Sequence, residues 1–231
     1  MPDPQFAAGA AAERFAQLAV ELHSTGGVDE TVQAVVDFAL QALDCSHAGV
    51  ALSVSGRKLE IPAVTDPVVA EIYELQMNGG KGPLADSMRD RSTIIVSDVA
   101  TDGRWPEWAE KVLGLGVRSV VDVPLATATG TVGVLGLYSV RPDAFGPDDV
   151  AIAHILARHA SVAVATARSE QTLAQAVDAR KLVGQAMGIL MERYDLDGDR
   201  AFEVLRRYSQ DTNRKLRDVA QDLIDTRKLP H

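Results

Sequence analysis

The sequence contains little cysteine, fewer basic than acidic residues, and no long apolar run without turn-forming residues. Cys45 is the only cysteine among 231 residues, which excludes an internal disulfide framework and a cysteine-built metal site. It follows an apolar helical pattern, which favours a buried thiol over a redox sensor. The longest uncharged segment, Val123–Val140, is broken by Pro124 and three glycines, so it indicates strands and turns rather than a membrane span.

Acidic residues outnumber basic ones by 32 to 23, and the net charge of −9 argues against indiscriminate binding to nucleic acid. The acidic excess lies before Glu170, because the charges from Glu170 onward balance. Within residues 200–217 basic residues predominate, as a phosphate-contacting surface requires, although a solvated helix face has the same composition. The first residues lack the basic stretch and apolar run of a signal peptide, so we expect a cytoplasmic protein.

Changes in hydrophobic periodicity divide the first two thirds of the chain into strands and helices. Alternating patterns predict strands at Ala48–Val54, Lys58–Val64, Ser92–Val96, Arg118–Leu125 and Thr131–Val140. Helical patterns predict helices at residues 15–22, at 32–43 with Asp29 as N-cap, from Asp66-Pro67 to about Met77, and from Pro106 to Gly114 or Gly116. These elements predict an α+β fold in which helices pack on a five- or six-stranded antiparallel sheet.

From Pro147 the chain is predicted to form one long helix. Apolar residues line one side of it, and neither proline nor glycine interrupts it before Gly184. Such a helix can run from a first domain into a second and pair with its twin in a dimer. Clean heptads are missing, so the pattern does not by itself specify a coiled coil.

The C-terminal segment shows three helical patterns, of which the first continues the long helix. The break falls at residues 194–199, where Asp197 or Asp199 is the expected N-cap of the next helix. In the second helix, the side chains expected to point into the core are those of Ala201, Phe202, Leu205 and Tyr208. The third helix is expected to begin near Thr212 or Asn213. Its side chains expected to point into the core are those of Leu216, Val219, Ala220, Leu223 and Ile224. A three-helix bundle of this size is helped by a partner.

Patterns typical of catalytic or metal sites are missing from the sequence. Asp195, Asp197 and Asp199 resemble the start of a calcium loop, but Arg200 and Arg206 stand where such a loop needs glycine and glutamate. No arrangement of serine, histidine or cysteine stands out as catalytic, and no glycine-rich loop matches a phosphate-binding pattern. We therefore expect neither an enzyme nor a metal protein.

Short motifs between residues 82 and 145 occur in a defined order. They are Gly82-Pro83-Leu84 with Asp86, Ser97-Asp98-Val99, Arg104-Trp105-Pro106, Gly116-Val117-Arg118-Ser119, Val123-Pro124-Leu125, Gly133-Val134-Leu135-Gly136-Leu137-Tyr138-Ser139 and Ala144-Phe145. In order and spacing this set resembles the GAF domain. The resemblance implies a sensor domain over residues 15–168, after an N-terminal segment at 1–14. GAF domains bind many ligands and sometimes none, so the family does not identify the signal.

A ligand pocket is expected in this domain, against the sheet. The loop before Pro83 and the segment Trp105–Trp108 are the candidate walls, because tryptophan supplies stacking or apolar area. The residues assigned to the pocket are Gly82, Trp105 and Trp108. The alternative interpretation is that both tryptophans simply cover the core. A small-molecule ligand of unknown identity is the only cofactor that we expect.

A second set of motifs lies in the C-terminal segment. They are Ala186-Met187-Gly188-Ile189-Leu190-Met191, Ala201-Phe202, Leu205-Arg206, Asn213, Lys215-Leu216 and Val219-Ala220. They resemble the ANTAR domain signature, here over residues 169–231. ANTAR proteins bind paired hairpin loops in nascent transcripts and prevent terminator formation, usually as dimers driven by a sensor domain. The resemblance therefore implies a transcription antitermination regulator whose partners are RNA and a second copy of itself, with no membrane.

RNA loops are recognised by polar groups at unpaired bases and by cations at phosphates, and both kinds of residue are predicted here. The predicted RNA-binding residues are Gln185, Gly188, Ser209, Asn213 and Lys215 near the bases and Arg206, Arg214 and Arg217 at the phosphates. Met187 departs from the family pattern, because lysine is usual at this position. Two alternatives stay open: a helical tail that mediates only dimerisation or protein partnering, and a helix-turn-helix-like module that binds DNA.

Overall fold

The computed structural model describes residues 27–54, 58–77, 80–128 and 130–228. The chain divides into two compact units, Met1–Arg168 and Ser169–His231, which we describe separately. The expected N-terminal segment 1–14, the helix at residues 15–22 and the turn at Ser55-Gly56 lie outside the described residues.

The first unit is built on a five-stranded antiparallel sheet with the strand order β2-β1-β5-β4-β3. The strands are β1 (His47–Val54), β2 (Lys58–Val64), β3 (Ile94–Val96), β4 (Ser119–Thr127) and β5 (Gly130–Ser139). All five predicted strands are present, with ends shifted by one or two residues. The predicted α+β class and antiparallel sheet are therefore confirmed, with five strands in the part of the chain that the structure describes.

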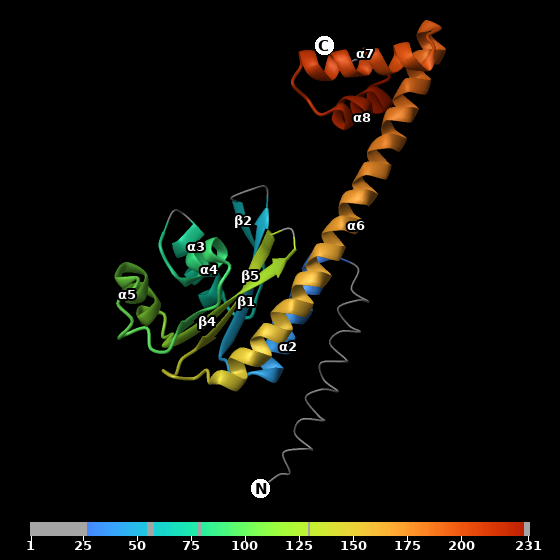
Figure 1. The fold of residues 1–231 in the computed structure, drawn as a ribbon. Helices are drawn as coiled ribbons and strands as arrows, with labels where there is room; N and C mark the ends of the chain where they lie inside the picture. The colour runs from blue at the N-terminus through green and yellow to red at the C-terminus, as the bar shows by residue number, and fades with distance from the viewer. Residues whose placement is uncertain (1–26, 55–57, 78–79, 129, 229–231) are drawn as a thin grey trace, which may run out of the picture. The chain divides into compact units, whose positions relative to one another are not determined.

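Helices cover both faces of this sheet (Figure 1). One face carries α2 (Val28–Ala42) and the first half of α6 (Pro147–Tyr194), and the other carries α3 (Pro67–Met77), α4 (Pro83–Asp90) and α5 (Pro106–Gly114). The sequence did not predict α4. Only three of its residues are buried, so its short sequence shows no clear apolar stripe.

The first unit has one hydrophobic core on each face of its sheet, and successive side chains of β4 alternate between the two cores. Val121 and Val123 are buried in the cluster with α2 and α6, whereas Val120 is buried in the cluster with α3, α4 and α5. Asp122 lies between Val121 and Val123, so it shares the face of Val120, and it is fully buried there. The sheet therefore places a carboxyl group inside an apolar core.

Helix boundaries agree with the sequence in most places. Asp66 caps α3 as predicted, because its carboxylate accepts a hydrogen bond of 2.9 Å from the backbone N–H of Val68. The predicted cap at Asp29 is wrong: Gly27 is the N-cap of α2, and Asp29 lies in the first turn. An acidic residue is favourable in either position because the helix dipole is positive there, which is why the pattern did not separate them.

The second unit packs the last part of α6 against α7 (Gly198–Asp211) and α8 (Leu216–Thr226). Its core contains Ala186 and Leu190 of α6. It also contains the residues Ala201, Leu205, Val219, Ala220 and Leu223, which the second and third helical patterns predicted to be buried. Asp197 is the N-cap of α7 and accepts a hydrogen bond from the backbone N–H of Arg200 at 2.8 Å. Two predictions need correction. The third helix begins at Leu216 rather than near Thr212 or Asn213, and Phe202 is 38% exposed rather than inward.

Among the described residues, α6 is the one helix long and apolar enough to cross a membrane by length and composition. This is weak evidence for a membrane span, because core helices of soluble proteins meet the same criterion. Ala153, Leu156 and Ala160 of α6 are buried in the core cluster of the first unit. That face of the helix already has its partner in the sheet.

Cys45 is half-buried after α2, and burial raises the pKa of its thiol to about 11. The thiol therefore stays protonated near neutral pH, and a protonated thiol is a poor nucleophile. Both observations favour the buried spectator over the redox sensor.

Candidate ligand cleft and nucleic-acid interface

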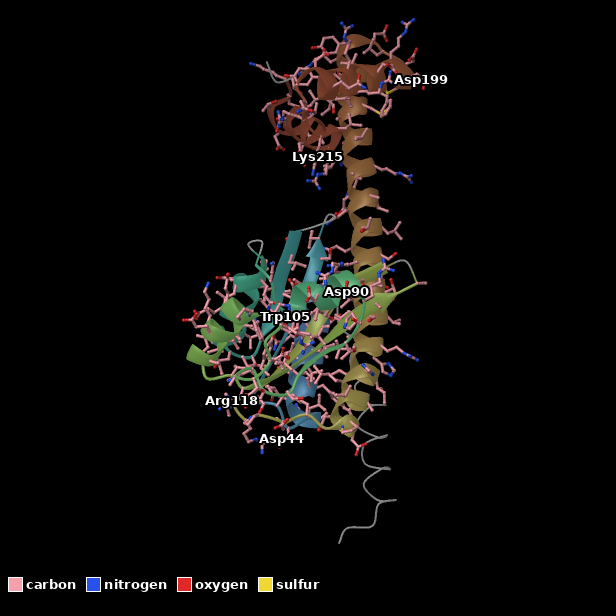
Figure 2. The ribbon with its side chains drawn as sticks, turned by 60° about the vertical axis from the view of Figure 1, so that its left-hand side comes forward. Asp44, Asp90, Trp105, Arg118, Asp199 and Lys215 are labelled. Atoms are coloured by element: carbon pink, nitrogen blue, oxygen red, sulfur yellow. The ribbon has the colours of Figure 1, made fainter. Side chains whose placement is uncertain are left out.

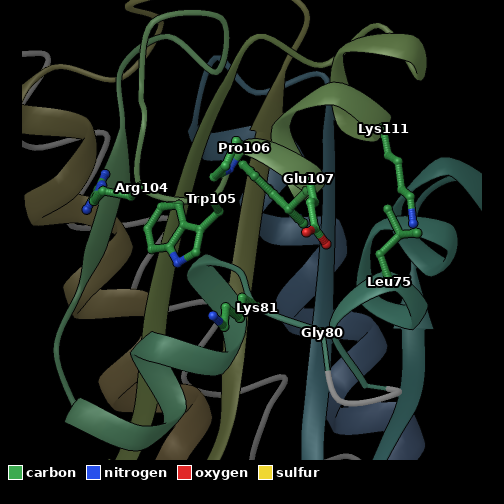
Figure 3. Close-up of a pocket in the computed structure, with 9 residues that line it drawn as sticks. Leu75, Gly80, Lys81, Arg104, Trp105, Pro106, Glu107 and Lys111 are labelled. Atoms are coloured by element: carbon green, nitrogen blue, oxygen red, sulfur yellow. The ribbon is translucent and has the colours of Figure 1, made fainter.

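A cleft of about 350 Å³ opens in the first unit between the end of α3 and the start of α5 (Figure 3). Its lining residues are Leu75, Gly80, Lys81, Arg104, Trp105, Pro106, Glu107, Trp108 and Lys111. This volume lies within the range of small-molecule sites, about 300 to 1,000 Å³. Two of the three residues predicted for a pocket, Trp105 and Trp108, therefore line a cleft of suitable size.

The two tryptophans form part of the core as well as a wall of the cleft. Trp105 and Trp108 are 7% and 4% exposed, and their rings meet edge to face with centroids 6.0 Å apart. Asp86 of α4 holds Trp105, because its carboxylate accepts a hydrogen bond of 2.9 Å from the indole N–H. The wall is therefore rigid, as a preformed binding site requires.

The lining of the cleft is cationic although the chain as a whole is acidic. Lys81, Arg104 and Lys111 line it together with one carboxylate, Glu107. In Figure 3, Lys81 and Lys111 lie on opposite sides of Glu107. The guanidinium group of Arg104 lies 4.4 Å from the Trp105 ring centroid and pairs with Asp102. Hydrogen bonds from this arginine lower the pKa of the Asp102 carboxyl.

Gly82, the third residue predicted for the pocket, lies outside the lining. A side chain at this position would collide with Gln76, since a Cβ atom would lie 2.2 Å from its Oε1 atom. The same Oε1 accepts a hydrogen bond of 2.9 Å from the backbone N–H of Leu84 in the first turn of α4. Gly82 thus permits the α3–α4 contact that supports the cleft.

The core of the first unit also contains a polar cluster that the sequence did not predict. Tyr73 of α3, Tyr138 of β5 and Asp122 of β4 converge above Gly136. A Cβ atom on Gly136 would lie 2.6 Å from both hydroxyl oxygens and 2.8 Å from the Asp122 carboxylate. Tyr73 donates its hydrogen bond to the backbone oxygen of Gly49 at 2.8 Å. A signal was present in the sequence: Asp122 is the charged residue within an apolar strand pattern.

Asp122 has no hydrogen-bond partner for either carboxylate oxygen within the described residues. Complete burial raises the pKa of this carboxyl to about 8. The cause is desolvation, because an ion loses far more hydration free energy on burial than a neutral acid does. Asp122 is therefore largely protonated at neutral pH.

In the second unit, most of the residues predicted to bind RNA fall into two groups. Ser209, Asn213, Arg214 and Lys215 surround the turn between α7 and α8, and the Ser209 hydroxyl donates to the backbone oxygen of Arg214 at 2.6 Å. Asn213 adopts a left-handed conformation with φ of 53°. The turn is therefore fixed by its own contacts, and Lys215, labelled in Figure 2, begins α8 as its N-cap.

The other group lies on α6, where Gln185 and Gly188 are exposed. At about 100° per residue, Gln185 lies roughly 160° around the helix from Met187, which packs against the core of this unit. A Cβ atom on Gly188 would meet nothing within 4 Å. Gln185 therefore faces away from the flank of α6 that carries Met187.

The predicted phosphate-binding arginines all form exposed ion pairs with nearby carboxylates. Arg206 pairs with Glu203 at 2.5 Å, Arg214 with Asp222 at 2.6 Å and Arg217 with Asp218 at 3.3 Å. Exposed pairs contribute little stability, so the arginines can exchange these carboxylates for phosphates at low cost. Lys215 has no ion pair among the described residues.

Comparison with family models finds two domains in this chain. A model described as GAF domain matches residues 25–165, and a model described as ANTAR domain matches residues 171–224. No curated protein matches the chain at a significant level.

Several solved structures share the fold of the first unit. The GAF domain from a phosphoenolpyruvate-protein phosphotransferase of Coxiella burnetii is 15% identical, with a TM-score of 0.56, and covers 70% of this chain and 96% of its own. The corresponding domain from Acinetobacter is 13% identical, with a TM-score of 0.55, covering 71% and 98%. A free methionine-R-sulfoxide reductase of Neisseria meningitidis, solved with its substrate, is 16% identical, with a TM-score of 0.55, covering 69% and 91%.

Proposed function

Because the chain belongs to the GAF domain family and carries an ANTAR domain, we propose that it is a transcription antitermination regulator. In this proposal the first unit senses a signal, and the second binds paired hairpin loops in nascent RNA and thereby prevents a terminator from forming. The observation that carries the proposal is the presence of an RNA-binding module behind a sensor domain in one chain. The proposed regulator is cytoplasmic and has no catalytic step of its own.

The turn between α7 and α8 is the proposed RNA contact. Lys215 stands at the start of α8, where unpaired backbone N–H groups and the helix dipole favour an anion. Arg214 and Arg217 flank it and are held only by exposed ion pairs. Three cations beside one helix start supply the phosphate contacts that RNA binding requires.

The cleft beside Trp105 is the proposed signal site, and its lining favours a small anion. Trp105 and Trp108 are only 7% and 4% exposed, so the charges of the cleft are the main attraction for a ligand. Lys81 and Lys111 outnumber Glu107 there, whereas Arg104 is paired with Asp102. The reductase of Neisseria meningitidis shows that a protein of this fold holds a small substrate. An acidic protein with a cationic cleft concentrates small anions there by electrostatic attraction.

Titration with benzoate or phenyl phosphate is expected to change the tryptophan fluorescence of the protein in a saturable manner. Both tryptophans of the chain line the cleft, so this signal comes from the cleft alone. Benzylamine, a planar cation of similar size, is the matched control and is expected to leave the fluorescence unchanged. An equal response to benzylamine, or no saturable response to either anion, would contradict an anion site.

A homodimer is part of the proposal, with α6 as the contact between copies. Four large apolar side chains of this helix are exposed by 45% to 67%: Ile155, Val162, Leu173 and Val177. Such exposed apolar residues along one helix favour association. Light scattering on the full chain is expected to give twice the mass of 24.7 kDa, and a monomer mass at micromolar concentration would contradict this part of the proposal.

Competition between nucleic acids tests the function. The full chain is incubated in about 50 mM salt with a labelled RNA that carries two hairpins in tandem, because phosphate contacts are strongest at low salt. Unlabelled copies of this RNA are expected to displace the label, and duplex DNA of equal length is expected to fail. Displacement of the label by duplex DNA would indicate that the C-terminal helices bind DNA. If the chain does not bind the RNA at all, these helices would serve only dimerisation or contacts with other proteins.

A further inference from the structure

The second unit contains a groove of about 380 Å³ where α6, α7 and α8 meet. Its walls are apolar and include Val183, Met187, Phe202 and Leu216, and two arginines, Arg180 and Arg217, also line it. Among the described residues, no carboxylate belongs to the lining. The groove adjoins the proposed RNA contact, because Leu216 and Arg217 directly follow Lys215 at the start of α8.

Phe202 is the main aromatic surface in this groove. The sequence pattern predicted it in the core, yet 38% of its surface is exposed. Burying an aromatic ring removes a large apolar area from water. A ligand that covered the exposed part of the Phe202 ring would therefore gain binding free energy. The opposite side is open, because a Cβ atom on Gly184 of α6 would meet nothing within 4 Å.

Met187 gives the groove its apolar character on the side of α6. Its terminal methyl group lies 3.8 Å from the position of a Cβ atom on Gly198, so the side chain extends toward the start of α7. It lines the same groove as Arg180 and Arg217, at a position where lysine is usual in ANTAR domains. The chain thus has an apolar surface at this point and retains cations beside it.

We propose that this groove receives one unpaired base of an RNA loop. The base lies against the ring of Phe202, and Arg180 and Arg217 contact the phosphates on either side of it. Aromatic rings bind bases of any sequence by stacking, and arginine adds both charge and a planar surface. This inference rests on the proposed RNA binding and extends it to Phe202 and Arg180, which the sequence analysis did not assign to RNA.

A second copy of the chain fits the groove less well than RNA does. In a two-fold dimer each surface patch meets its own copy, so Arg180 and Arg217 would be brought toward the same two arginines. The lining offers no carboxylate to offset that repulsion. Asp218 pairs with Arg217 at 3.3 Å, but both side chains are about half exposed and the pair is easily exchanged for a phosphate.

The test combines base removal in the RNA with truncation of the protein. Each loop nucleotide of the tandem-hairpin RNA is replaced in turn by an abasic nucleotide, and dissociation constants are measured for the full chain. We expect one loop position at which base removal weakens binding roughly tenfold or more. Phe202→Ala is expected to weaken binding of the intact RNA by a similar factor and to show no further loss with that abasic RNA.

Two further variants separate the groove from folding. Gly184→Leu fills the mouth of the groove with a residue of better helix propensity, so it is expected to weaken RNA binding about tenfold while the melting temperature is unchanged or higher. Tyr194→Ala removes an aromatic ring that is 54% exposed and lies outside the groove, and it is expected to bind like the wild type.

Several outcomes would overturn the inference. If the losses from Phe202→Ala and from the abasic nucleotide multiply, the ring does not contact that base. If Phe202→Ala and Gly184→Leu bind intact RNA normally but lower the molecular mass in light scattering, the groove belongs to a second copy. If the wild type itself fails to bind the RNA, the proposed function fails together with the groove. If the wild type binds the RNA and both variants bind it equally well, the proposed role of the groove is wrong while the proposed function stands.

Discussion

Asp122→Asn is expected to stabilise the first unit strongly at alkaline pH and to flatten the dependence of its stability on pH. The folded state holds the Asp122 carboxyl at a pKa of about 8, whereas an unfolded chain ionises near its ordinary pKa of 3.8. Between these values, unfolding releases a proton, so rising pH favours the unfolded state. This contribution is fully favourable below about pH 4 and is lost progressively until about pH 8.

The size of the effect follows from the separation of the two pKa values. Each pH unit within that window changes the free energy of unfolding by about 1.4 kcal/mol, which amounts to a loss on the order of 5 kcal/mol across it. The side chain of asparagine has a similar shape and does not ionise in this pH range. The variant should therefore lose far less stability between pH 5 and pH 8 than the wild type.

Urea unfolding followed by tryptophan fluorescence measures this directly, since both tryptophans lie in the first unit. Tyr73 and Tyr138 are the titratable groups that face Asp122 from α3 and β5, and burial raises the pKa of both hydroxyls, so neither ionises in this range. Asp90→Asn is a control at an exposed carboxylate and is expected to keep the wild-type profile. A flat profile in the wild type, or an unchanged slope in Asp122→Asn, would contradict the account.

Arg214→Ala combined with Lys215→Ala is expected to weaken binding of the tandem-hairpin RNA about 100-fold near 0.1 M salt, at roughly tenfold for each lost phosphate contact. Removal of Arg214 also leaves Asp222 unpaired near the same surface, which adds a repelling charge. The slope of log affinity against log salt should become shallower by about 1.5. The turn itself should persist, because Ser209 bonds to the backbone oxygen of Arg214 rather than to its side chain.

Arg200→Ala with Lys228→Ala is the matched control for this variant. It also removes two cations, but from the start of α7 and from beyond the end of α8, away from the turn at residues 212–215. Its affinity should fall only slightly and its salt slope should stay near that of the wild type. Equal losses in the two double variants would indicate attraction by overall charge rather than by a defined site.

The sequence was sufficient for most of the architecture and for part of the sites. Strands such as β1 and the helices of the second unit follow a clear period of two or of 3.6 residues, and these periods decide which residues are buried. The helix α4 was missed because its eight residues bury only Pro83, Leu84 and Ser87. Periodicity needs several apolar positions before it can indicate an element.

The sites were harder to predict because their parts come from distant segments. The carboxyl of Asp122 meets Tyr73 and Tyr138, which are separated from one another by 65 positions and lie on different elements. Phe202 has the spacing of a core residue, and only the packing of α6 and α8 shows that its ring borders a groove. The sequence pointed to Trp105 and Trp108, which line the cleft, but not to Lys81 and Lys111, because single surface lysines carry no pattern.

The central claim, antitermination, is tested most directly by transcription through a terminator in vitro. The template encodes a transcript that folds either into two tandem hairpins or into a terminator, and the fraction of full-length transcript is measured. The account predicts that the full chain raises this fraction as its concentration increases, and that the variant with Arg214→Ala and Lys215→Ala does so only at about 100-fold higher concentration. An unchanged fraction at protein concentrations that saturate the RNA in a binding assay would contradict it.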